Sequence, residues 1–296
     1  MFIRLILLLI FNHLLCDFIF QNDKIKELRF YKKKKKDTLS VVLHSTLKGN
    51  LIHSGIHGLN FLLLYLLNNY LSFWFPNFKY YNGITLPIPF VPMILTILLL
   101  VISHFVIDEL KSIYLSYHST QSQKLSIFFF DQILHFLSLF CITTLYFCLP
   151  NINSLSDAEI YKDPNFFLQG DELLVAGVII LICTAFAGIF IDFFFHYLDR
   201  RNVKKENSNA ADLFPDSETS SEINRGGFMI GIIERLLILA AILSSQPMLV
   251  GFIFTAKSIV RLSKLKEDKF AEYFLIGNSL SFLIAILGSC CINLMF

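Results

Sequence analysis

The sequence predicts an all-α protein that crosses a membrane several times as a bundle of about eight helices. Hydrophobic residues make up 55% of the 296 residues and charged residues only 16%, whereas a soluble domain carries about a quarter charged residues. Mean hydropathy is +0.61. Several apolar runs reach the roughly 20 residues that a helix needs to cross a bilayer. These runs are continuous, whereas a transmembrane β-barrel needs alternating segments of about ten residues.

The eight predicted helices follow the apolar runs and are separated by more polar stretches of different lengths. They cover residues 2–20, 40–74, 91–110, 125–148, 172–198, 228–244, 247–262 and 270–293. The first helix looks like a signal peptide, but no small-x-small cleavage pattern follows it, so we expect it to be retained. The stretch SSQP, residues 244–247, predicts a tight turn. We expect two helical regions, residues 1–148 and 172–296, and a flexible cytoplasmic linker over residues 199–227.

The distribution of basic residues predicts the orientation of the bundle. Most of the 25 Lys and Arg residues fall in four connections, at residues 21–37, 111–124, 199–227 and 257–269. Because cytoplasmic loops are rich in Lys and Arg, we expect these connections in the cytoplasm and both termini on the other side. The lysine run 32–36 is interpreted as a topology anchor that also contacts anionic lipid head groups. Membrane lipids are therefore the expected partners.

Several other site classes find no support in the sequence. The six cysteines contain no CxxC pair and lie in or beside apolar runs, so we expect them to pack between helices. No Gly-rich phosphate loop and no nucleic-acid motif is present. The formal net charge of +2 does not indicate a partner, and nothing in the sequence identifies a protein partner.

Five predicted helices each carry two ionisable residues at positions i and i+4. These pairs are His13 and Asp17, His53 and His57, His104 and Asp108, Asp131 and His135, and Asp192 and His196. Four residues turn a helix by about 400°, so the two side chains of a pair lie on one face. With the predicted orientation, all five pairs lie toward the cytoplasmic leaflet. Charged groups near the centre of a membrane helix cost at least about 2.5–3.5 kcal/mol each and usually mark function.

Imidazole and carboxylate groups are common ligands of zinc, manganese and iron. We therefore expect the first four pairs to bind one or two divalent metal ions. The predicted metal ligands are His13, Asp17, His53, His57, His104, Asp108, Asp131 and His135. The alternative is a set of interhelical hydrogen bonds, worth on the order of 1 kcal/mol each. Asp192 and His196 border a polar helix end and are equally explained as helix-end residues, while Gln21 is either a second-shell donor or a helix-end residue.

A second polar group falls in the last three predicted helices. It consists of Glu234, Arg235, Lys257, Arg261 and Glu272. Glu234 and Arg235 are sequence neighbours and point about 100° apart, so one can pair with a lysine or arginine while the other faces a pocket. We expect Arg235, Lys257 and Arg261 to bind a substrate phosphate beside the metal, and Glu234 to take part in catalysis. The alternative is a structural network of ion pairs.

Seven stretches of the chain resemble an uncharacterised family of bacterial membrane proteins, domain of unknown function 3307. They are HLLCDFIFQ, LIHSGIHGL, SHFVIDELK, DQILH, GIIERLLILAAIL, GFIFTAKSIVR and AEYFLIGNSLSF. The resemblance covers most of the chain and implies that the eight predicted ligands, Gln21 and the second polar group belong to the family pattern. Asp192 and His196 match nothing in it. The family has no established activity, so the resemblance supports the site and not a reaction.

The favoured function is that of a metal-dependent hydrolase in the cell membrane, with a site that faces the cytoplasm. Its expected substrate is an amphiphile, such as a phospholipid or a lipid-linked phosphate, with Asp108 or Asp131 as general base. One alternative is a transporter or channel for divalent cations or protons, which would need polar groups continuing toward the outer face, where the helices are nearly all apolar. Another is a non-catalytic sensor or effector that acts through residues 199–227.

Overall fold

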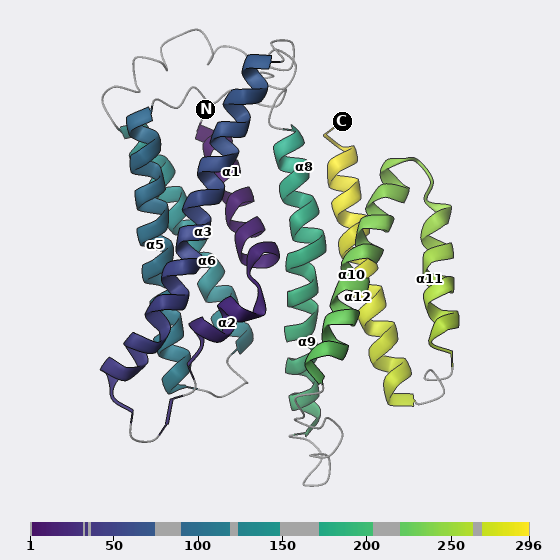
Figure 1. Cartoon of the computed structure of the whole chain (residues 1–296). Coiled ribbons are helices and arrows are strands. Elements are labelled where there is room, and N and C mark those ends of the chain that lie inside the picture. The colour runs from purple at the N-terminus through teal and green to yellow at the C-terminus, as the bar shows by residue number, and fades with distance from the viewer. Residues whose placement is uncertain are drawn as a thin grey trace. The chain divides into compact units, whose positions relative to one another are not determined.

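The computed structural model describes most of the chain. The described residues are 2–31, 33–34, 37–74, 90–118, 124–148, 172–203, 220–262 and 268–295. All regular structure in these ranges is helical (Figure 1), which confirms the predicted fold class. Seven helices are long and apolar enough to cross a membrane, and the chain is a multi-pass membrane protein. The side of the membrane on which each terminus lies remains a prediction.

The chain divides into two compact units, Met1–Val178 and Ile179–Phe296. The elements of the first unit are α1 (Phe2–Leu15), the π-helix η1 (Cys16–Phe20), α2 (Asp23–Arg29), α3 (Leu39–Trp74), α5 (Phe90–Tyr117), α6 (Lys124–Cys148) and the start of α8 (Glu172–Leu181). Helices α1, α3, α5 and α6 form a closed bundle, since α1 contacts α3, α3 contacts α5, α5 contacts α6 and α6 contacts α1.

Helix α3 shows how the polar residues reach the interior of this bundle. A polar stripe spaced alternately by four and three residues is buried along its length, at Thr46, Asn50, His53, His57 and Asn60. The opposite face carries leucines that are half exposed or more, such as Leu51, Leu59 and Leu63. Lipid tails accept apolar side chains at no cost, whereas a polar group there would lack a partner. The sequence pattern therefore turns the polar stripe inward.

One end of the bundle is filled by an apolar cluster. It consists of Leu5, Leu9, Phe61, Met93, Leu100, Leu139, Ile142 and Tyr146. On α1, Leu5 and Leu9 are fully buried and precede the buried Asn12 and His13. The cluster therefore closes the end of the bundle at which α1 begins, and the polar side chains lie beyond it, toward α2.

The sequence predicts a basic connection at residues 21–37, but the structure has the short helix α2 within it. It begins with Asn22, whose side chain accepts a hydrogen bond from the backbone N–H of Ile25 at 3.0 Å, an N-cap. A Cβ atom on Gly49 would collide with the backbone of Leu28 and Arg29. Glycine at this position therefore allows α2 to pack directly against α3. Helix α5 is also longer than predicted and ends at Tyr117.

The second unit contains four helices and a second π-helix. They are η4 (Ile182–Phe186), α9 (Ala187–Val203), α10 (Ser220–Leu243), α11 (Met248–Val260) and α12 (Asp268–Asn293). The predicted turn at residues 244–247 is present, with Ser245 at φ 58°. Helix α11 has 13 residues and spans about 20 Å, less than the roughly 30 Å of a bilayer core.

Two predicted loops fall largely outside the described residues. Within the predicted linker 199–227, residues 199–203 are part of α9 and residues 220–227 are part of α10, while residues 204–219 are not described. Residues 149–171, between the predicted helices 125–148 and 172–198, are not described.

Candidate metal centre

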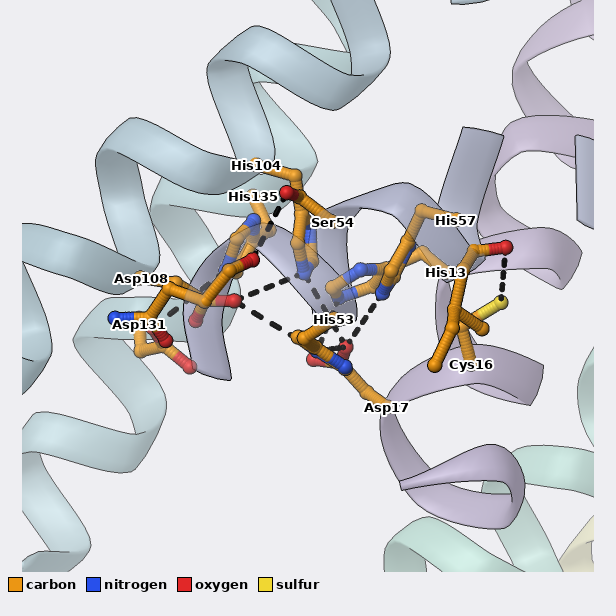
Figure 2. A network of polar contacts seen from close by, with 12 residues as sticks. His13, Cys16, Asp17, His53, Ser54, His57, His104, Asp108, Asp131 and His135 are labelled. Carbon is orange, nitrogen blue, oxygen red and sulfur yellow. Dashed lines mark hydrogen bonds and ion pairs between the residues drawn. The ribbon is translucent and has the colours of Figure 1, made fainter. Parts of the chain in front are cut away.

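Helices α1, α3, α5 and α6 and the π-helix η1 bring the eight predicted ligands together inside the first unit. Figure 2 shows their side chains pointing toward one another from these separate elements. The histidines are His13, His53, His57, His104 and His135, and each is at most 1% exposed. Asp108 and Asp131 are also buried, and the side chain of Asp17, which η1 supplies, is 12% exposed. π-helical turns are rare and occur frequently at functional sites.

Asp17 is the common neighbour of the histidines on α1, α3 and α5. Its Oδ1 atom accepts hydrogen bonds from Nε2 of His53 and Nε2 of His57, both at 3.0 Å. Nε2 of His104 lies 3.5 Å from the same oxygen, and Nε2 of His13 lies 3.7 Å from Oδ2. Four imidazoles thus direct the same ring nitrogen at a single carboxylate.

Asp108 and Asp131 extend the cluster toward α6. Oδ2 of Asp108 lies 3.1 Å from Nε2 of His104 and 3.6 Å from Nε2 of His53. Nε2 of His135 lies 3.7 Å from Oδ1 of Asp108 and 3.6 Å from Oδ1 of Asp131. The structure therefore links all the predicted pairs of the first unit through three carboxylates.

Several of these close contacts are not hydrogen bonds. Four buried atoms have no hydrogen-bond partner among the described residues: His104 Nε2, His135 Nε2, Asp108 Oδ2 and Asp131 Oδ1. The distances from these imidazole nitrogens to carboxylate oxygens of Asp108 and Asp131 are 3.1 to 3.7 Å. Two ligands of one tetrahedral zinc ion, each about 2.0–2.1 Å from the metal, lie roughly 3.3 Å apart. The spacing of these nitrogen and oxygen atoms is compatible with ligands around a shared cation.

Three overlapping groups of ligand atoms could each hold an ion. They are His13, Asp17, His57 and His104; His53, His104 and Asp108; and Asp108, Asp131 and His135, and within each group the ligand atoms lie within 4.8 Å of one another. His104 and Asp108 each belong to two groups, so the groups share ligands. Metal-bound histidines usually donate their second ring N–H to an acceptor, but Nδ1 of His13, His53 and His57 has no such partner among the described residues.

Two cations that were not predicted as site residues hold the carboxylates. The guanidinium of Arg29, from α2, lies 2.5 Å from Oδ1 of Asp108. The ammonium of Lys111, from α5, lies 2.6 Å from Oδ2 of Asp131. Each aspartate therefore has one oxygen on a cation and the other facing an imidazole nitrogen, so Arg29 and Lys111 orient the ligands.

A glutamine supports the α6 side of the cluster. Oε1 of Gln132 lies 3.3 Å from Nε2 of His13, and its amide nitrogen donates to Oδ2 of Asp131 at 3.3 Å. Gln21, for which the sequence allows a second-shell donor or a helix-end residue, is the C-cap of η1.

A further buried network lies between the cluster and α2. Nε of Arg29 donates to Oδ1 of Asn50 at 2.8 Å, and Nδ2 of Asn50 donates to Oε2 of Glu109 at 2.6 Å. Thr46 donates to the other oxygen of Glu109 at 2.6 Å. With neutral imidazoles, the joined networks hold four carboxylates, from Asp17, Asp108, Glu109 and Asp131, and the two cations Arg29 and Lys111. One divalent cation would neutralise the remaining charge.

The second polar group of the sequence lies in the second unit. Nζ of Lys257 donates to Oε2 of Glu234, which is the lysine–glutamate pairing considered for these helices. Arg235 bonds to Ser281 and to the carbonyl of Thr184 instead. That these residues and Arg261 bind a substrate phosphate, and that Glu234 is catalytic, remain predictions.

The other polar residues singled out in the sequence lie elsewhere. The guanidinium of Arg261 is 5.7 Å from the centre of the Phe274 ring. Glu272 and Asp192 are exposed. The side chain of His196 lies outside the described residues.

A family model described as "Protein of unknown function (DUF3307)" matches residues 5–160, which include the first four stretches of the resemblance and all eight predicted ligands. The three stretches from the second half of the chain lie outside the matched range. No curated protein and no solved structure matches the chain.

Proposed function

The chain belongs to the DUF3307 family of proteins of unknown function, and we propose that its first unit is the divalent-metal centre of a membrane-bound hydrolase. The observation that carries the metal centre is the set of buried ring nitrogens and carboxylate oxygens that face one another without hydrogen bonds, at His104, Asp108, Asp131 and His135. Buried polar groups are otherwise almost always paired. A cation held in one of the ligand groups that contain Asp108 would give the atoms of that group a partner.

The charge of the site favours one resident ion. With neutral imidazoles, the four carboxylates and two cations leave two uncompensated negative charges, which one divalent ion offsets. A second ion would need an accompanying anion, such as a substrate phosphate. Nitrogen and carboxylate ligands suit zinc, manganese or iron(II). A bound divalent ion supplies Lewis acidity and lowers the pKa of a bound water toward about 7. With the ion held by His53, His104 and Asp108, Oδ1 of Asp131 is not occupied by Lys111 and is the proposed proton acceptor.

The surroundings of the centre support approach from the α2 end of the bundle. On the other side, the apolar cluster around Leu5, Leu9 and Phe61 is buried. The most exposed members of the charged network are Asp17 and Lys111, with 12% and 21% side-chain exposure. The sequence orientation places this end at the cytoplasmic leaflet, near lipid head groups. An amphiphilic phosphate, either a phospholipid or a lipid-linked phosphate, is therefore the proposed substrate class.

A transporter for divalent cations or protons is the alternative use of the same ligands. It would need a polar path through the bundle, and the apolar cluster occupies the position of such a path in the described residues. Ions cross hydrocarbon only at high cost. The apolar cluster therefore favours the hydrolase over transport.

Hydrolysis is tested with the full-length protein in detergent, loaded with zinc, manganese or iron(II). Mixed micelles containing phosphatidic acid or a polyprenyl phosphate serve as substrates, and released phosphate is measured. We expect release that a chelator abolishes and that Asp131→Asn lowers by about 10²–10⁴-fold, the usual share of a general base. His44→Ala, on an exposed histidine of α3, is the matched control. Equal rates in wild type and Asp131→Asn on every substrate would contradict the hydrolase but not the metal centre.

A further inference from the structure

Arg235 is a buried cation in the second unit, midway along the apolar span Gly226–Leu243. It is 3% exposed, and no carboxylate oxygen lies within ion-pair distance of its guanidinium among the described residues. Its neighbour Glu234 bonds to Lys257 instead. A charge buried in a membrane span without a counter-ion is unfavourable and is normally paired. The described part of the second unit therefore contains a buried cation with no carboxylate in direct contact.

Unused hydrogen-bond donors lie on this guanidinium and on the helix that contacts it, α12. Its two terminal nitrogens donate to Oγ of Ser281 at 3.1 Å and to the carbonyl of Thr184 at 2.8 Å, but Nε has no partner among the described residues. Nδ2 of Asn278 is also buried and unpartnered there. Asn278 and Ser281 lie three residues apart on α12 and so share a face. The Ser281 hydroxyl accepts from Arg235, so its own proton can still be donated.

The backbone around Arg235 is shaped to receive the guanidinium. A Cβ atom on Gly188 would lie 2.9 Å from one terminal nitrogen, and a Cβ on Gly231 would lie 3.2 Å from the other. Thr184 belongs to the π-helix η4, a local widening of the helix of the kind found at functional sites. Two glycines and a π-helical turn thus fix the position of a charged group whose remaining donors are free.

We propose that Arg235, Asn278 and Ser281 form a binding site for an oxyanion, the phosphate or carboxylate head group of an amphiphile. An oxyanion offers only acceptors and so fits a set of free donors beside a guanidinium. Because Arg235 lies midway along an apolar span, a ligand that reaches it is expected to carry an apolar tail. None of these observations depends on the metal centre or on the hydrolase proposed above.

Native mass spectrometry of the full-length protein, stripped of lipid by detergent exchange, tests the site. Two matched pairs of probes differ only in the head group: phosphatidic acid against diacylglycerol, and a fatty acid against the corresponding fatty alcohol. Inorganic phosphate is a separate arm that reports whether the oxyanion alone suffices. We expect one equivalent of an anionic probe to bind and the neutral member of each pair to bind at least tenfold more weakly.

Variants separate this site from general lipid binding. Arg235→Gln is expected to abolish selective binding, and Asn278→Leu, which keeps the cation, to weaken it about tenfold, as for loss of one hydrogen bond to a charged group. Thr255→Val is the control, because this exposed hydroxyl on α11 bonds only the carbonyl of Gly251. Binding of neutral and anionic probes with equal affinity, or an Asn278→Leu protein that binds like Thr255→Val, would overturn the proposal.

Discussion

Arg29 and Asp108 form a buried ion pair, with 2.5 Å between the guanidinium and Oδ1 of the carboxylate. Arg29 comes from the short helix α2, outside the apolar spans, whereas Asp108 lies in the transmembrane helix α5. The pair holds one oxygen of Asp108 and leaves the other 3.1 Å from Nε2 of His104. The helix that follows the first span thus helps to orient a proposed metal ligand.

Removal of Arg29 is expected to destabilise the first unit strongly. Arg29→Gln leaves the buried Asp108 carboxylate without its cation, which typically costs about 3–5 kcal/mol. The measurement is thermal unfolding of the metal-free protein in detergent. Lys24→Gln, on an exposed residue of the same helix, should change stability by less than about 0.5 kcal/mol. Equal unfolding temperatures for the two variants would show that the ion pair contributes nothing.

Gly49 is expected to be sensitive to a single added methyl group. In Gly49→Ala the Cβ collides with the backbone of Leu28 and Arg29, so α2 must move away, at a cost of about 1–3 kcal/mol. Gly55→Ala is a matched control on the same helix, because nothing lies within 4 Å of its Cβ. Alanine there should stabilise the helix by up to about 1 kcal/mol. Thermal unfolding should therefore shift in opposite directions for the two variants.

Asp37 gives a pH-dependent prediction outside the spans. The backbone N–H of Lys34 and then the hydroxyl of Tyr31 donate to its carboxylate and hold the pKa of Asp37 below its ordinary value of 3.8. Because both bonds are strongest with the ionised carboxylate, they stabilise the folded state above pH 3.8, and this stabilisation is lost as pH falls through the lowered pKa. Tyr31→Phe should raise the pKa of Asp37, as followed by carbon NMR of the carboxyl group. An unchanged titration would mean that the Tyr31 bond is absent in solution.

The apolar cluster predicts that the protein does not conduct metal ions. Vesicles that contain the full-length protein and a trapped metal-sensitive dye should take up zinc or manganese no faster than empty vesicles, because Leu5, Leu9 and Phe61 fill the end of the bundle. Uptake that Asp108→Asn abolishes would support the transporter instead.

Much of the fold and the ligand set could be predicted because periodicity is a local property. Apolar length locates the spans, and the i, i+4 pairs place ligands on one face of each helix. Asn50 lies three residues before His53, and Lys111 lies three residues after Asp108. Each therefore lies on the same helix face as the predicted ligand beside it. These residues could therefore have been found from the spacing alone.

Arg29 could not be found in this way. Its role depends on how the chain folds back after the first span, and that path is set by Gly49 and by the cap at Asn22. A basic residue in a basic loop otherwise predicts only orientation. The pairing of Arg235 with a π-helical carbonyl was equally hidden, because a π-helix breaks the helical period.

Elemental analysis of the purified full-length protein, expressed in metal-replete medium, tests the central claim most directly. We predict one equivalent of a divalent transition metal per chain in wild type and in His44→Ala, and almost none in His104→Ala or Asp108→Asn after dialysis against a weak chelator. A wild-type protein that is folded but carries no stoichiometric metal, or an Asp108→Asn protein that carries as much as wild type, would contradict the metal centre and leave a network of hydrogen bonds in its place.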